Sequence, residues 1–279
     1  MFNFQLTLPS GRNVRIPEIN NEHLFTIFKF CIAEDVVGFA NYIEDKIFCN
    51  IKGLSCVEKI YITLYIRILC LGPVIEMQGI EGEDGQSPKI SVDLYDVIER
   101  LENLPVIEDK VIDIETFKLT VGLPGKIGYE TSDEVVFGCV KVLDDGETKL
   151  DIESLTKEQL DEIYNLLPPF FLSKINDFLV SSNNSLGELV VIKGSENLKL
   201  KEVKCSLIGN SITSMIMSLF KHDYQSFVEM VYHFINKVGG SYEDFLKLTL
   251  QDTQIMLRTY QREMEKQNEE LNKAKNGHK

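Results

Sequence analysis

The sequence predicts an α+β protein with a mostly helical body, an N-terminal β-hairpin and a mixed β/α middle section. Apolar and polar residues alternate strictly near the start of the chain, which is typical of strands. Apolar residues recur at helical spacing over residues 21–71 and again after residue 206. With 44% hydrophobic and 26% charged residues among 279, the composition is globular and the length allows a full core.

The first expected element is a β-hairpin. Apolar residues alternate with polar ones over residues 2–8, and Pro-Ser-Gly supplies turn residues at positions 9–11. The alternation resumes over residues 13–16. Pro17 ends the second strand, because proline lacks the N–H that a strand ladder needs.

Three helices are expected next. Asn20 or Asn21 caps the first, and the second covers residues 35–48. The third begins at Ser55, and Glu58 stands three residues later, as in a capping box. This third helix is apolar nearly all round, so we expect it in the core, and a Gly-Pro pair stops it.

The middle section changes character and alternates between short strands and helices. Strands are predicted over residues 74–80 and 89–92, and a short helix is predicted over residues 94–101. Residues 111–121 alternate well and are interpreted as one long strand. Residues 135–143 fit a strand or a helix equally.

Two further helices and a second hairpin follow. Thr156 is expected to start a helix with a second capping box, and consecutive prolines break it before another amphipathic helix at residues 170–180. Residues 181–185 are interpreted as a polar loop. The hairpin is expected to pair residues 189–192 with residues 198–203.

From Ser206 onward the chain is expected to be helical. Gly239-Gly240 should end one helix at a C-cap, and Thr249 can cap the last one. The last helix turns from amphipathic to polar along its length. A polar helix end of this kind projects into solvent, receives a partner, or frays at the terminus.

The pattern divides the chain into three parts. Residues 1–71 hold the N-terminal hairpin and helices, residues 72–205 the mixed β/α middle section, and residues 206–279 a helical region that packs on the N-terminal part. No linker-like stretch marks either boundary, so the division of the middle section into a separate domain stays open.

Charge and hydropathy exclude several classes of partner. The formal charge of −14 repels phosphate backbones and anionic lipid heads, so neither nucleic acid nor a membrane is expected as a partner. The densest basic stretch, Lys193, Lys199, Lys201 and Lys204, is diluted by glutamates and is interpreted as a hairpin edge. We expect no secretory signal and no spanning helix, since no run approaches about 20 apolar residues.

The sequence offers few residues in patterns that carry chemistry. Phosphate-binding, dinucleotide, zinc-protease and serine-hydrolase motifs are absent from it, so no catalytic residue, cofactor or metal site is assigned and no enzyme is expected. The four His stand at no ligand spacing from any Cys, and the six Cys are expected to be reduced core thiols. The acidic stretch 81–85 fits a solvated turn better than a calcium loop.

Three stretches of the chain resemble a known family. They are FQLTLPSGRNVRIP at residues 4–17; LTKEQL at 155–160 with LPPFFLSKI at 167–175; and residues 211–220 with YHFINKVGGSYEDF at 232–245 and Leu-Thr at 248–249. In this order they resemble the baseplate hub subunit and hub assembly proteins of T-even-type contractile-tailed bacteriophages. The resemblance lies in the general pattern of residue types and in the order of the expected elements, and it contains no invariant chemical signature.

The resemblance implies a non-enzymatic protein that joins or helps to assemble the central hub of a phage tail baseplate. It implies synthesis in the host bacterial cytoplasm, a place in the virion tail, and other baseplate and tail proteins as partners. It also allows a homo-oligomer, because hub assemblies are symmetric. The alternatives left open are an assembly chaperone that is absent from the mature virion, and a hydrolytic enzyme without a recognisable motif.

Exposed apolar and aromatic residues near the termini are the candidates for protein contact. The alternative for each is simple packing in the core. The polar helix over residues 261–271 is a second candidate, in the helix-docking mode. The candidate contact residues are Phe2, Phe4, Tyr242, Phe245 and Tyr260.

Overall fold

The computed structural model describes residues 4–78, 89–114, 117–144, 146–152, 155, 157–192 and 202–276. The first elements are β1 (Phe4–Thr7), β2 (Asn13–Ile16), α1 (Asn21–Ala33), α2 (Val36–Ile43), the π-helical turn η1 (Glu44–Phe48), α3 (Cys56–Leu71), β3 (Val74–Gln78), β4 (Lys89–Asp93) and α4 (Leu94–Glu102). The next are β5 (Lys110–Ile114), β6 (Phe117–Val121), α5 (Ser132–Phe137), β7 (Val140–Asp144), β8 (Lys149–Asp151), α6 (Lys157–Leu166) and α7 (Pro169–Leu186). The last are β9 (Glu188–Ile192), β10 (Val203–Ser206), α8 (Asn210–Lys221), α9 (Tyr224–His233), the π-helical turn η4 (Phe234–Val238), α10 (Tyr242–Lys247) and α11 (Leu250–Asn276).

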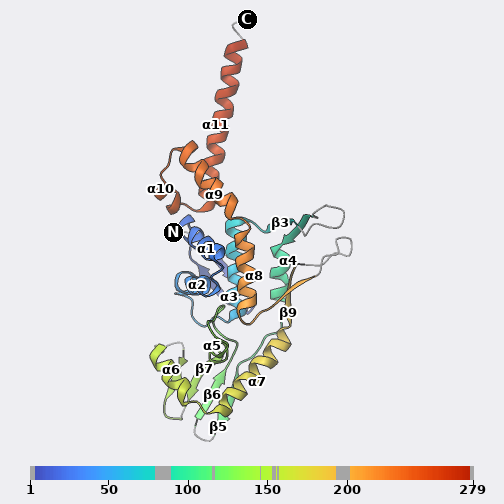
Figure 1. Cartoon of the computed structure of the whole chain (residues 1–279), viewed down its shortest axis with the longest axis vertical. Helices are drawn as coiled ribbons and strands as arrows, with labels where there is room; N and C mark the ends of the chain where they lie inside the picture. Colours follow the sequence, from blue (N-terminus) through green and yellow to red (C-terminus); the bar gives the residue numbers. More distant parts are fainter. Residues whose placement is uncertain are drawn as a thin grey trace.

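The molecule is elongated, and its helical body lies between two different ends. Figure 1 shows α11 projecting from one end, and the sheet of β5, β6 and β7 with α6 and α7 at the other end. Helices with small antiparallel sheets confirm the predicted α+β class. None of the helices in the described ranges is both long enough and apolar enough to cross a bilayer.

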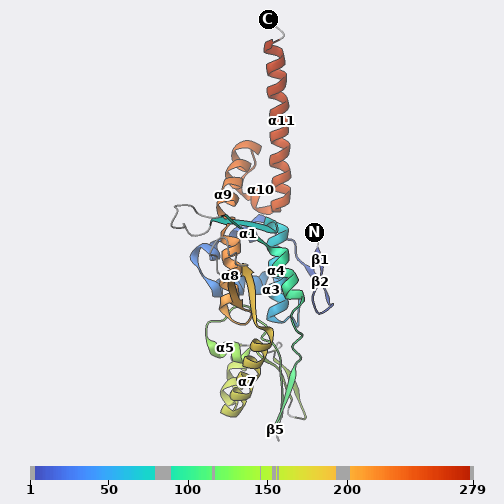
Figure 2. The same cartoon turned by 90° about the vertical axis from the view of Figure 1, so that its right-hand side faces the viewer.

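The N-terminal hairpin forms as the alternation predicts. β1 and β2 pair antiparallel with Leu6 opposite Val14, and both side chains are buried against the body. The turn packs on the start of α3, where the Ser10 hydroxyl donates to the Glu58 carboxylate at 2.7 Å. Figure 2, turned by 90°, shows the hairpin beside α3.

Capping side chains in the sequence determine where several helices of the body begin. The Asn20 side chain caps α1, and Asp35 caps α2, which continues into η1 up to Phe48. Ser55 and Glu58 form the predicted capping box at the start of α3. α3 lies in the middle of the body, with Arg67 and most of its apolar residues buried, although Leu69 is 49% exposed.

The predicted long strand over residues 111–121 is wrong, because the segment folds into two antiparallel strands. β5 and β6 pair with Ile112 opposite Leu119 and Ile114 opposite Phe117. The phase of the alternation changes in this segment. Apart from the exposed Val111, apolar residues fall at even positions up to Ile114 and at odd positions from Phe117 on. One strand would place half of them on the wrong face, whereas a hairpin places them together. The ambiguous segment 135–143 contains the end of α5 followed by β7.

The predicted polar loop at residues 181–185 is also wrong, because α7 continues through it to Leu186. Its buried stripe runs from Ile175 and Phe178 on to Ser182 and Leu186. The helix ends only at Gly187, whose φ of 67° is the left-handed conformation that glycine adopts without strain. Helical periodicity therefore outweighs the polar composition of these residues.

The second hairpin has its first strand, β9, where the sequence predicts it. β9 pairs antiparallel with β10 at residues 203–206, while residues 198–201 of the predicted second strand lie outside the described residues. The helical region starts at Asn210, slightly later than predicted. Gly239 ends η4 in the left-handed conformation, and Thr249 caps α11 by accepting from the Asp252 N–H at 3.1 Å, both as predicted. Several expected features lie outside the described residues: Phe2, the acidic stretch 81–85, Thr156, Lys193, Lys199 and Lys201.

Buried apolar side chains in the described ranges form two clusters. The larger cluster draws on residues 6–127 and 186–250, and the smaller one on residues 119–178, where Phe117 stacks on Phe171 at 4.7 Å between ring centroids. β3, β4, α4, β9 and β10 contribute to the larger cluster. The ends of the 72–205 section thus pack with the helical body, and the division into 1–71, 72–205 and 206–279 stays a prediction.

Candidate protein-interaction surface

Exposed apolar side chains are frequent on the four C-terminal elements α9, η4, α10 and α11. Of the sixteen large hydrophobic residues that are exposed in the described ranges, seven fall between residues 228 and 264. We call these seven the C-terminal apolar set: Val228, Tyr232, Ile235, Tyr242, Ile255, Met256 and Met264. Exposed apolar side chains scattered singly are ordinary, but such a concentration on one segment is typical of a contact surface.

One part of the set follows the outer face of α9 and η4. Val228, Tyr232 and Ile235 are spaced by four and three residues, which brings them to one side of the helix. Tyr232 is 62% exposed. Phe227 and Phe234 of the same helical stretch are buried on the inner side. This stretch therefore carries two apolar faces, of which the body covers one.

Phe245 lies in the core and not on this surface, which corrects its choice as an exposed contact residue. Its side chain is fully buried, and its ring lies edge-on to Phe227 at 5.5 Å and to Phe234 at 5.6 Å. The capping box of Ser241 and Asp244 fixes the residue at which α10 begins, and the side chain of Phe245 then points into the core. Core packing was the stated alternative for this residue.

The other candidate contact residues differ in exposure. Tyr242 is 39% exposed and rests edge-on against Phe25 of α1, with 6.1 Å between the ring centroids. Phe4 is 41% exposed at the start of β1, and Tyr260 is half-buried on α11. Phe2 lies outside the described residues. Of the C-terminal apolar set, only Tyr242 was among the contact residues predicted from the sequence. The other members were not predicted.

The sequence contains a pattern that could have identified the contact residues that were not predicted. Phe227, Met230, Val231 and Phe234 define one apolar face by helical spacing. Tyr232, with Val228 and Ile235, falls outside that face and makes a second one. A helix with two apolar faces at the edge of a body has one face more than the body can cover, and this points to a partner.

Buried hydrogen bonds join this C-terminal end firmly to the first helix. The Asn21 side-chain amide donates to the Phe245 carbonyl and to the Thr253 hydroxyl, each at 2.9 Å, and Asn21 and Thr253 are fully buried. The backbone N–H of Asn21 donates to the Leu248 carbonyl at 2.8 Å. The base of α11 is therefore held by the body.

A cavity of about 870 Å³ offers the best place to look for an enzymatic site. It lies among α2, η1, α5, β7 and the segment before α5. The Lys59 ammonium reaches the Glu44 carboxylate at 2.6 Å inside it. Burial raises the pKa of Glu44 above its usual range, and the adjacent Lys59 opposes that shift.

The other carboxylates of this cavity lie in different surroundings from Glu44. Glu130 and Asp133 are exposed, and the Glu134 carboxylate accepts from the Glu130 N–H at 2.9 Å. Glycoside hydrolysis uses a pair of carboxylates that flank one reacting bond. Glu44 is ion-paired with Lys59, so the cavity does not favour that class of hydrolase. Within the described ranges, no three His, Cys, Asp or Glu side chains gather to hold a metal.

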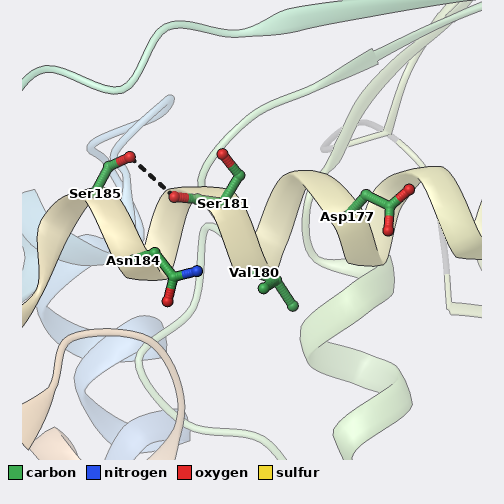
Figure 3. Close-up of a pocket in the computed structure, with 5 residues that line it drawn as sticks. All are labelled: Asp177, Val180, Ser181, Asn184 and Ser185. Carbon is green, nitrogen blue, oxygen red and sulfur yellow. Dashed lines mark hydrogen bonds between the residues drawn. The ribbon is translucent and has the colours of Figure 1, made fainter.

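A smaller depression lies on the outer side of α7. Figure 3 shows the five residues that line it, Asp177, Val180, Ser181, Asn184 and Ser185, along one helix. The Ser185 hydroxyl donates to the Ser181 carbonyl at 2.9 Å, so it is bonded within the helix. Asp177 is the one charged residue among these five, and none of the five is aromatic. We therefore assign this depression no function.

Comparison with known proteins finds one family that matches most of the chain. Residues 1–185 match the model of a family described as T4 bacteriophage base plate protein. The chain matches no curated protein and no solved structure. The C-terminal apolar set lies beyond the matched residues.

Proposed function

The chain belongs to the family of T4 bacteriophage base plate proteins, and we propose that it works in the baseplate hub through contacts with neighbouring tail proteins. The family supports a structural role in a phage baseplate. The resemblance of residues 4–17, 155–175 and 211–249 to hub subunits and hub assembly proteins supports the finer assignment. The place of action would be the virion tail, after synthesis in the host cytoplasm.

One observation carries this proposal: the C-terminal apolar set on an end of the molecule that is rigidly joined to the body. Val228, Tyr232 and Ile235 offer a strip of apolar surface, and apolar strips of this kind are buried when protein partners associate. The buried rings of Phe227 and Phe234 pack against Phe28 and Phe245 and hold α9 and η4 on the body, so a partner would meet a preformed surface. The formal charge of −14 favours protein partners over nucleic acid or a membrane surface.

Complementation of a phage that lacks this gene tests the proposal. A plasmid copy should restore plaques, and a copy with Val228→Ser, Tyr232→Ser and Ile235→Ser should restore at least about tenfold fewer, since hot-spot truncations at an interface typically cost more than 1 kcal/mol each. Electron microscopy of the lysates should then show free heads and tails without complete baseplates.

A matched control separates loss of contact from loss of folding. Ile32→Ser, Tyr95→Ser and Val106→Ser remove three other exposed apolar side chains of the same residue types. We expect this control to complement fully, and circular dichroism should show both triple variants folded. Full complementation by the surface variant, or plaques without any copy of the gene, would refute the contact role.

An assembly factor that leaves before the particle is complete would use the same surface. The sequence resemblance fits both roles, and the proposal here is the virion component. The two roles differ in one respect, namely whether the protein stays in the finished particle.

A further inference from the structure

The outer part of α11 extends well beyond the body. Leu250 and Thr253 are buried at its base, and the helix packs there against η4 and α3. Residues 261–269 are all exposed, and Figures 1 and 2 both show this part of the helix clear of every other element. At 1.5 Å per residue, residues 261–276 reach about 24 Å.

The distal segment is held as a helix by its local contacts and by continuity with the base of α11. Isolated helices gain most of their stability only from tertiary packing, and the distal segment stands clear of the other described elements. A hydrogen bond from Gln261 to Glu265 at 3.3 Å supports the segment. Like charges four residues apart, such as Arg262 with Lys266, are offset by opposite charges at helical spacing, such as Glu263 with Lys266. A second helix alongside would add the tertiary contacts that local pairs do not provide.

The residues of α11 follow a heptad repeat that leaves a nearly uncharged seam. Apolar residues recur every seven positions at Leu250, Leu257, Met264 and Leu271. Three residues after each of the first three of these stand Thr253, Tyr260 and Gln267. These are the a and d positions of a coiled coil.

The charged residues between 256 and 269 avoid this seam. Glu263 borders it at a g position, while the other five occupy the outer positions b, c and f. These five are Arg258, Arg262, Glu265, Lys266 and Glu269. The distal helix therefore has a face that is uncharged and partly apolar, and this face is exposed over residues 261–269.

We propose that the distal part of α11 pairs in register and parallel with the same helix of a second copy of this chain. Gln267 occupies a d position, where an apolar partner helix would leave its amide without a bond. In a parallel pair of identical chains, Gln267 meets Gln267 and the two amides bond each other. The g-position Glu263 of one copy then faces the e-position Asn268 of the other, a neutral donor.

The distribution of net charge favours contact through this helix. α11 contains five Lys or Arg and five Asp or Glu, so its net charge is zero, and the whole formal charge of −14 lies elsewhere in the chain. Two bodies of that charge repel each other, whereas two α11 helices do not. The parallel pairing would place both bodies at the same end of the paired helices and join them through the neutral helices rather than through their charged surfaces.

Mass and cross-linking in the purified full-length chain test the inference. We expect light scattering after gel filtration at about 50 µM to give at least twice the monomer mass, and Met264→Lys to restore the monomer because it places like charges in the seam. Arg262→Glu, on the outer face, should leave the larger mass unchanged. Circular dichroism and a melting curve should show both variants folded.

Disulfide cross-linking then tests the parallel register. In a Cys49→Ser background, which removes the exposed native thiol, Gln267→Cys should form a covalent dimer on mild oxidation and Arg262→Cys should not. A monomer at all concentrations overturns the pairing. A larger mass without the Gln267→Cys cross-link, or with equal cross-linking at both positions, overturns the parallel in-register arrangement.

Discussion

The side chain of Asn21 donates a hydrogen bond of 2.9 Å to the Thr253 hydroxyl, although 232 residues separate them in the chain. The Thr253 hydroxyl in turn donates to the Thr249 carbonyl at 3.0 Å. Both side chains are completely buried. These two hydrogen bonds fix the base of α11 to the first turn of α1. They therefore also set the direction in which the distal helix leaves the body.

Removing this contact should destabilise the whole body. Asn21→Ala leaves the Phe245 carbonyl and the Thr253 hydroxyl without their donor, which should lower the free energy of unfolding by about 1–3 kcal/mol. Urea unfolding measures the loss. Asn184→Ala, exposed on α7, is the matched control and should stay within about 0.5 kcal/mol of the parent chain.

A double-mutant cycle isolates the contact itself. Asn21→Ala combined with Thr253→Val should lose about 0.5–1.5 kcal/mol less than the sum of the two single changes. Strictly additive losses would mean that the two side chains do not depend on each other.

Arg67 in the middle of α3 should be another point of high sensitivity. Its guanidinium is fully buried, forms an ion pair with Asp223, and donates to the carbonyls of Gly72 and Leu219. Burial lowers the pKa of Arg67, and the Asp223 carboxylate opposes that shift. Asp223→Ala should cost about 3–5 kcal/mol, because it leaves a buried charge without its partner.

A double substitution tests whether the loss of stability comes from the unpaired buried charge or from lost packing. Arg67→Met together with Asp223→Ala should cost less than Asp223→Ala alone, because no charge is then buried unpaired. Arg15→Met, at an exposed position on β2, is the control for loss of an arginine. A larger loss in the double variant would contradict this account.

Phe245 and Tyr242 provide a matched pair on one short helix. Phe245→Ala opens a cavity among Phe227 and Phe234 and should cost about 3–5 kcal/mol of unfolding free energy. Tyr242→Ala removes an edge contact to Phe25 and should cost about 0.5–1.5 kcal/mol. Thermal unfolding compares the two, and equal losses would mean that Tyr242 is a core residue as well.

The thiols should react selectively with an aromatic disulfide reagent at pH 8. Burial raises the pKa of Cys31, Cys56 and Cys139 to about 12, so roughly one molecule in 10⁴ carries the reactive thiolate at that pH. Cys49 is exposed and should react in the fast phase. Cys49→Ser should abolish that phase, and a second fast thiol would contradict the burial described here.

Local signals in the sequence predicted most of the fold, because they act within a few residues. Ser55 with Glu58 starts α3, Gly239 ends η4, and Thr249 starts α11, each through bonds to nearby backbone. The error at residues 181–185 came from giving composition more weight than periodicity, and the error at residues 111–121 came from missing a change of phase in the alternation. The phase change between Ile114 and Phe117 marks a hairpin, and Ser182 continues a buried helical stripe.

The candidate surface was less predictable, because exposure depends on which partner elements arrive from elsewhere in the chain. Tyr242 and Phe245 are both aromatic and three residues apart, yet one is 39% exposed and the other fully buried. The difference follows from the docking of α10 beside α9 and η4 on α1. Sequence spacing does not contain that arrangement.

Quantitative mass spectrometry of purified phage particles, beside the lysate of infected cells, tests the proposed function most directly. A hub component should appear in the particles at a fixed few copies, together with the other baseplate proteins. Abundance in the lysate with absence from the particles would contradict a virion component and identify an assembly factor instead.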